Sequence, residues 1–189
     1  MSNRLIMGVD PGLTRCGVGV IEELPRRGVA FVFGDTIRAD KDLSLEERIR
    51  FVADDIERLI NVYKPSAIAL ERVFAQANLR SVMGVAQISG VVLYLAAKHR
   101  IPIHMHTPSE VKAAVTGNGR AAKPQITSAV QKILKLAEPP TPADTADALA
   151  IAITQSWRPA TGESVASPKT KAQEAWLAAE RASKSSSKG

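Results

Sequence analysis

The sequence predicts an α/β protein with a mixed five-stranded sheet covered by helices. Two patterns support this prediction. Short apolar runs between turn residues, typical of strands, occur at five places, and apolar residues with helical spacing lie between and after the later runs. The resulting order is three strands, then helix, strand, helix, strand, and finally three helices. This order indicates an antiparallel meander extended by parallel strands.

The N-terminal strands are predicted to pair as a meander. Leu5–Val9 is an apolar run that stops at the turn residues Asp10-Pro11-Gly12. A second strand is expected over the valine-rich stretch Arg15–Ile21, and a third over Val29–Ile37, after a turn at 25–28. Because only short turns join these segments, we expect neighbouring strands to run antiparallel.

The middle of the chain alternates helix and strand. Ser44 and Glu47 have the spacing of a capping box, and apolar residues keep helical spacing behind them as far as Tyr63, where a proline soon ends the helix. Ala67–Leu70 is then predicted as a buried strand that stops at Glu71.

The remaining elements complete the sheet and its cover. Asn78 can cap a long helix that continues to about His99, and Ile103–His106 is predicted as the fifth strand. Three helices are expected near 108–115, 124–136 and 142–156. Each of them begins at a proline, which is tolerated in the first turn of a helix.

We expect one domain over residues 1–158 and a flexible basic tail over 159–189. Thr, Ser, Lys and Gly accumulate after Pro159, and the chain ends in ASKSSSKG. Cys16 is the single cysteine, so no internal disulfide is expected, and no apolar run approaches the roughly 20 residues that span a bilayer. These features favour a cytoplasmic protein.

Positive charge is concentrated in one segment. Residues 98–136 contain seven Lys or Arg and one acid, which accounts for the net charge of +6 of the whole chain. Such a basic stripe suggests a polyanionic partner, nucleic acid before membrane, although solvated helix faces can have the same composition. Asn118 lies in the glycine-rich loop Gly117–Gly119, and with Arg120 and Lys123 beside it this loop is predicted to approach DNA phosphates.

Carboxylates stand at the ends of two predicted strands and on one late helix. Asp10 and Glu71 each end a strand, and functional groups gather at strand carboxyl ends in α/β sheets. Asp144 and Asp147 lie three residues apart on one helix face, where like charges repel. A set of oxygen ligands without His or Cys suits Mg²⁺ or Mn²⁺ rather than zinc. Two such ions about 4 Å apart can hold the attacking water and the leaving oxygen of a phosphodiester.

Most of these acids also have an ordinary structural explanation. Asp10 suits a turn before Pro-Gly, and Glu71 suits an exposed strand end. Thr141–Asp144 resembles a capping box, and the helix dipole favours an acid in the first turn. Asp147 lies one turn deeper among alanine and leucine, where capping does not explain it.

Four stretches of the chain closely resemble the RuvC family of Holliday junction resolvases, in the RNase H-like superfamily. They are GVDPGLTRCG at Gly8–Gly17, ERVF at Glu71–Phe74, VKAAVTGNGRAAKPQ at Val111–Gln125 and ADTADALAIAI at Ala143–Ile153. A lone D-P-G turn also occurs in sugar kinases and actin-like ATPases, whereas the four stretches in this order and spacing are specific. The resemblance extends to about Arg158 and implies an RNase H-like fold.

The resemblance also implies an activity and its site. The family's members are metal-dependent endonucleases that nick two opposed strands of a four-way DNA junction and leave 5′-phosphate and 3′-hydroxyl ends. Their two-Mg²⁺ site, in which Mn²⁺ can substitute, implies the same ions here. The family's catalytic and metal-binding acids correspond to Asp10, Glu71, Asp144 and Asp147. Its base-wedging aromatic residue corresponds to Phe74, and its phosphate-contacting lysines correspond to Lys112 and Lys123.

Partners are implied by the same resemblance. The helix that begins near Asn78 resembles the dimer-forming helix of the family, which implies a homodimer, and the family works with the branch-migration proteins RuvA and RuvB. Thr145 stands where alanine is common in the family and is a small departure from its pattern.

Two other functions compete with this interpretation. A junction-binding protein that no longer cuts would also carry the basic segment, but it would not need all four acids. An actin-like ATPase would explain the D-P-G turn, but it needs two related domains and a longer chain. His104 and His106 share one face of a predicted strand and form a conceivable metal pair, although an ordinary strand face is favoured.

Overall fold

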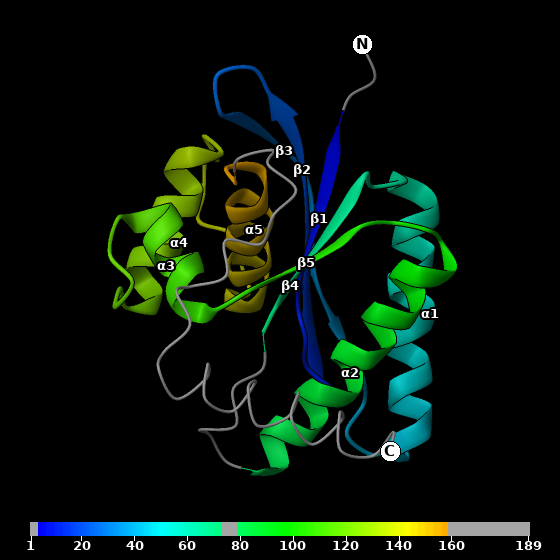
Figure 1. The fold of residues 1–189 in the computed structure, drawn as a ribbon. Helices are drawn as coiled ribbons and strands as arrows, with labels where there is room; N and C mark the ends of the chain where they lie inside the picture. The colour runs from blue at the N-terminus through cyan, green and yellow to red at the C-terminus, as the bar shows by residue number, and fades with distance from the viewer. Residues whose placement is uncertain (1–3, 73–78, 159–189) are drawn as a thin grey trace, which may run out of the picture. The chain divides into compact units, whose positions relative to one another are not determined.

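The computed structural model describes residues 4–72 and 79–158, which form a five-stranded sheet with helices on both faces (Figure 1). The sheet order is β3-β2-β1-β4-β5, in which β1–β2 and β2–β3 are antiparallel, and β1–β4 and β4–β5 are parallel. The mixed sheet predicted from the sequence is confirmed. The strands are β1 (Leu5–Asp10), β2 (Arg15–Leu24), β3 (Gly28–Arg38), β4 (Ala67–Glu71) and β5 (Ile103–His106).

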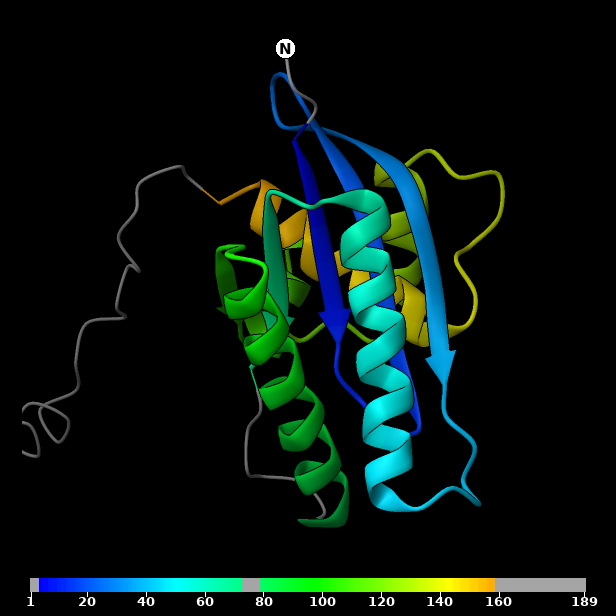
Figure 2. The same cartoon turned by 90° about the vertical axis from the view of Figure 1, so that its right-hand side faces the viewer.

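Helices cover the two faces of the sheet as separate layers (Figure 2). The first layer consists of α1 (Leu45–Tyr63) and α2 (Leu79–Lys98), and the second of α3 (Pro108–Thr116), α4 (Lys123–Ile133) and α5 (Ala143–Ser156). No helix within the described residues is long and apolar enough to cross a membrane. The predicted tail, residues 159–189, lies outside the described part of the chain.

Side chains of β1 alternate between the two layers, as a pleated strand requires. Met7 and Val9 are fully buried against the α1–α2 layer, whereas Ile6 is buried with residues of α3, α4 and α5. The same alternation in β4 places Ile68 and Leu70 on the first side and Ala69 on the second. Both central strands of the sheet are therefore buried on both faces.

Helix α5 lies unusually close to the sheet because glycines form part of the surface beneath it. A Cβ atom added at Gly8 would overlap the carbonyl oxygen of Ala148, and one added at Gly17 would overlap the carbonyl oxygen of Asp144. Any larger residue at these two positions would push α5 outward. The glycines of β1 and β2 therefore set the distance between the sheet and this helix.

Two expectations about helix ends are wrong. The last helix, expected to begin at Pro142, begins at Ala143, because Pro142 is its N-cap. The N-cap makes no side-chain capping bond, so the capping-box explanation of Asp144 does not hold. Helix α4 ends at Ile133 rather than Leu136, since Lys135 adopts a left-handed φ of 54° that turns the chain. The predicted capping box of α1 is confirmed, with Ser44 and Glu47 bonded in both directions.

A candidate active site at the carboxyl edge of the sheet

Asp10 and Glu71 emerge side by side at the same edge of the sheet. β1 and β4 are parallel neighbours, and their register pairs Val9 with Leu70, directly before the two acids. Because strand side chains alternate, Asp10 follows Ile6 and Glu71 follows Ala69 onto the face covered by α5. The parallel pairing of β1 with β4 is therefore what brings these two acids together.

Helix α5 brings the other two acids to this edge. Its first turn lies over Gly17 of β2, which is paired in register with Asp10. Asp144 therefore enters the helix beside the end of β1, and Asp147 follows one turn later on the same side. The close approach that Gly17 permits is what places both carboxylates near Asp10.

Most of the predicted site residues line one cavity of about 270 Å³. Asp10, Glu71 and Asp147 line it together with two lysines, Lys112 from α3 and Lys123 from α4. Its remaining walls are apolar and consist of Pro108, Val111, Ile126 and Ile151. The two lysines of the predicted phosphate contact and three of the four predicted acids thus border one hollow.

Burial, and after it the neighbouring acids, disfavour the charged forms of Asp10 and Glu71. The pKa of Asp10 is raised to about 8, first by burial of the carboxyl group and then by the charges of the other three acids. The pKa of Glu71 is raised by burial and by the charge of Asp147, while the two cavity lysines oppose the shift. A bound cation would offset the cost of burying these two charges close together.

Two basic side chains neutralise the acids of α5. Lys123 Nζ lies 3.1 Å from Asp147 Oδ2, and this contact raises the pKa of the lysine. Arg15 donates from Nε and Nη2 to Asp144 Oδ2, at 2.7 and 2.6 Å. The role of Arg15 was not predicted. Its place at the start of a valine-rich strand, shortly after the Asp-Pro-Gly turn, could have indicated a basic side chain near Asp10.

The donor set fits a hard divalent cation better than zinc. The acids at this edge supply carboxylate oxygens, which suit Mg²⁺ and Mn²⁺, and no histidine or cysteine lines the cavity. Within residues 4–72 and 79–158, no three His, Cys, Asp or Glu side chains already converge as a ligand set. Arg15 and Lys123 each hold one oxygen of a helical acid, Asp144 Oδ2 and Asp147 Oδ2 respectively.

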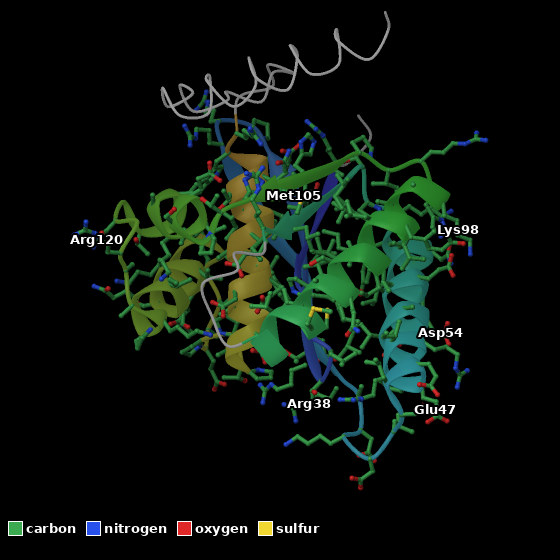
Figure 3. All side chains as sticks on the ribbon, turned by 60° about the horizontal axis from the view of Figure 1, so that its bottom comes forward. Arg38, Glu47, Asp54, Lys98, Met105 and Arg120 are labelled. Carbon is green, nitrogen blue, oxygen red and sulfur yellow. The ribbon has the colours of Figure 1, made fainter. Side chains whose placement is uncertain are left out.

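Asn118 and Arg120, the other predicted DNA-contacting residues in the described part of the chain, do not line this cavity. Asn118 and Arg120 are exposed in the connection between α3 and α4, where Asn118 Oδ1 accepts the Arg120 backbone N–H at 3.0 Å. Figure 3 shows Arg120 on the outer side of these helices. Phe74 lies outside the described residues.

His106 is buried against α5, whereas His104 is nearer the surface. The ring of His106 is buried and hydrogen-bonded through Nε2 to Gln155 Oε1 at 2.9 Å, and burial lowers its pKa. His104 is only partly buried. The His106–Gln155 bond is the kind of contact expected of an ordinary strand face, which the sequence favoured.

Comparison with known proteins gives one consistent family. The family model described as crossover junction endodeoxyribonuclease RuvC matches residues 6–155. The chain is 49% identical to a protein of that name from Renibacterium salmoninarum, across 93% of this chain and 91% of the relative. It is 50% identical to the corresponding protein of Pseudarthrobacter chlorophenolicus, across 93% of this chain and 94% of the relative.

Solved structures agree with the sequence matches. The chain superposes on Thermus thermophilus RuvC in complex with a Holliday junction substrate with a TM-score of 0.75 and 30% identity, covering 80% of this chain and 92% of the other. A yeast mitochondrial Holliday junction resolvase matches with a TM-score of 0.56 at 12% identity, which supports the fold alone. The expected RNase H-like fold is confirmed.

Proposed function

This chain belongs to the RuvC family of crossover junction endodeoxyribonucleases, and we propose that it resolves four-way DNA junctions with the acids at the carboxyl edge of its sheet. It hydrolyses one phosphodiester in each of two opposed strands and leaves 5′-phosphate and 3′-hydroxyl ends. The observation that supports this site most strongly is geometric: Asp10, Glu71 and Asp147 line one cavity together with two lysines.

Each acid has a proposed task in this reaction. Asp10 is central to the charge cluster and is assigned to contact both of two Mg²⁺ ions, for which Mn²⁺ can substitute. Glu71 and Asp147 are each assigned to one ion, and Asp144 is assigned to ligate a metal or orient water. Bound Mg²⁺ would activate the attacking water and stabilise the leaving oxygen.

Basic side chains around the cavity are proposed to hold the scissile strand. Lys112 and Lys123 line the same cavity as three of the acids. A phosphate bound near the carboxylates would therefore lie close to both lysines. Asn118 and Arg120 would contact phosphates farther along the strand from their exposed loop. Phe74 is proposed to stack on an unpaired base, a contact worth roughly 1–3 kcal/mol.

A homodimer would present two such sites to one junction. Helix α2 exposes apolar side chains on its outer face, including Met83 at 58%, Leu93 at 40% and Tyr94 at 64%. Gly90 lies on the same helix, and a Cβ atom added there would meet nothing within 4 Å. We assign this face to a two-fold dimer, since a four-way junction has approximate two-fold symmetry. RuvA and RuvB as partners, and the cytoplasm as location, are proposed from the family resemblance and the absence of a disulfide pair.

Substitution of Asp147 tests the assignment of the acids. Asp147→Asn keeps the size of the side chain and removes a proposed metal ligand. Loss of a residue that only orients a ligand typically costs about 10–100-fold. We expect the rate of four-way junction cleavage to fall by more than this. Binding of the same junction, measured by gel shift in EDTA, should change little.

Asp54→Asn is the matched control, because Asp54 is an exposed acid on α1, in the layer on the other face of the sheet (Figure 3). It should cut at the wild-type rate. Retained cleavage by Asp147→Asn would overturn the assignment, whereas a wild-type protein that binds the junction but never cuts it would support a binding-only function.

A further inference from the structure

Arg15 opens β2 at the edge where the acids gather, and its side chain crosses to α5. Its backbone is paired in register with Arg38 of β3, and Gly17, two residues later, is paired with Asp10. The guanidinium group donates to Asp144 of α5, 129 residues away in sequence. Arg15 therefore joins the sheet to the helix that carries two of the four acids.

The geometry of this contact fixes the orientation of the Asp144 carboxylate. Nε and Nη2 both donate to Oδ2, at 2.7 and 2.6 Å, and neither bond involves Oδ1. Two donors from one rigid, planar group define a direction, which a single ammonium group cannot do. Arg15 thereby fixes Oδ2 and itself leaves the second oxygen, Oδ1, uncontacted.

A second polar contact anchors the neighbouring residue of the same helical turn. Thr145 Oγ1 lies 3.0 Å from Thr36 Oγ1 of β3, and both side chains are buried. Thr36 is itself paired in register with Gly17, over which α5 begins. Consecutive residues of α5 are thus tied to β2 and to β3.

These contacts supply what the start of α5 otherwise lacks. Pro142, the N-cap, makes no side-chain capping bond, so the local sequence does little to fix the first turn. The position of Asp144 depends instead on long-range bonds to the sheet.

We propose that Arg15 is a positioning residue of the endonuclease: it holds Asp144 by Oδ2 so that Oδ1 is directed to the metal site before the metal binds. This inference rests on the function proposed above. A purely electrostatic role would have the opposite consequence for metal binding, because a guanidinium beside a carboxylate weakens its attraction for a second cation.

The variant Arg15→Lys separates geometry from charge. It keeps the positive charge and loses the two-point contact, and we expect the loss of a residue that orients a ligand to cost about tenfold or more in metal affinity or turnover. The first measurement is the affinity of the DNA-free protein for Mn²⁺, monitored through the electron paramagnetic resonance signal of the free ion. The second is kcat and KM for a four-way junction in Mg²⁺, where kcat should fall and KM should stay near the wild-type value.

Arg38→Lys is the matched control, because Arg38 is the cross-strand neighbour of Arg15 and shares its edge of the sheet (Figure 3). It should bind Mn²⁺ as the wild type does. Arg15→Gln completes the series by removing the charge as well, and it too should bind Mn²⁺ more weakly. Thermal unfolding of each variant establishes that it is folded under the assay conditions.

Three results would overturn the proposal. Arg15→Lys could match the wild type in both measurements, or Arg15→Gln could bind Mn²⁺ more tightly and cut normally, which would make Arg15 a mere counter-charge. Either variant could instead bind the junction more weakly in EDTA with unchanged Mn²⁺ affinity, which would make Arg15 a DNA contact. Failure of the proposed function has a different signature, since the wild type itself would then show no Mg²⁺-dependent nicking.

Discussion

Asp10 ends β1 beside three other acids, and in the metal-free protein burial and their charges raise its pKa to about 8, from an ordinary value of 3.8. The folded protein therefore holds this proton more tightly than the unfolded chain does. The resulting stabilisation is fully present below about pH 4 and is lost as the pH rises from there to about 8.

This shift predicts how the stability of the metal-free protein depends on pH. In EDTA, the melting temperature of the wild type should fall between pH 5 and pH 9 more steeply than that of Asp10→Asn, which has no proton to lose at this position. Mg²⁺ should restore stability most strongly at the alkaline end, because it replaces the proton as counter-charge. Parallel pH profiles for the two proteins would show that Asp10 ionises normally.

Residue identity and local spacing were enough to predict Asp10, Glu71 and Asp147 as a group, because strand ends and helix faces are local features. The partner of Asp144 could not be predicted in the same way. Arg15 and Asp144 lie 129 positions apart, and their contact depends on how closely α5 approaches β2. Thr145 was noticed as a departure from the family pattern, but its bond to Thr36 is visible only in the folded protein.

At the scale of elements, the distance between α5 and the sheet is the quantity on which the site depends. Gly17→Ala should push the first turn of α5 outward, because the new Cβ atom would overlap the carbonyl oxygen of Asp144. We expect a loss of roughly 1–3 kcal/mol in the free energy of unfolding, as for other overpacked sites. Junction cleavage should fall about 100-fold, since displacements of about 1 Å have costs of this size.

Gly19→Ala provides the comparison for general destabilisation. Its Cβ atom would overlap Leu149 of α5, at 2.8 Å from the side chain and 2.9 Å from the backbone nitrogen, farther along the helix than the two acids. Urea unfolding and single-turnover cleavage measured on both variants separate the two effects. Equal cleavage rates at equal loss of stability would show that the position of α5 does not govern the site.

Strand and helix assignments succeeded where the pattern was periodic, and failed at helix ends. The start of α5 was placed one residue early because proline is common at the first helical position. Here Pro142 is the N-cap instead, and the first turn is held through the sheet. The end of α4 depends on Lys135, which adopts a left-handed conformation. Lysine rarely adopts this conformation, so the sequence does not indicate a helix end at this position.

At the scale of the whole molecule, the fold brings the acids and part of the basic segment to the same edge of the sheet. The sheet places Asp10 and Glu71 at its carboxyl edge, α5 adds two acids, and α3 and α4 bring Lys112 and Lys123 from the basic segment to the same cavity. The exposed apolar side chains of α2, to which we assign the proposed dimer, lie on the opposite layer. A two-fold dimer would duplicate the hollow of acids and lysines, which would suit a substrate with two opposed strands to cut.

Mapping of nicks on a four-way junction tests this account most directly. The purified protein is incubated with a mobile junction, an immobile junction and a linear duplex, each labelled on every strand in turn, in Mg²⁺ or in EDTA. The account predicts nicks at symmetric positions on two opposed strands of the mobile junction, with 5′-phosphate ends, and none in EDTA or in the linear duplex. Equal cutting of the linear duplex, or nicking that persists in EDTA, would contradict it.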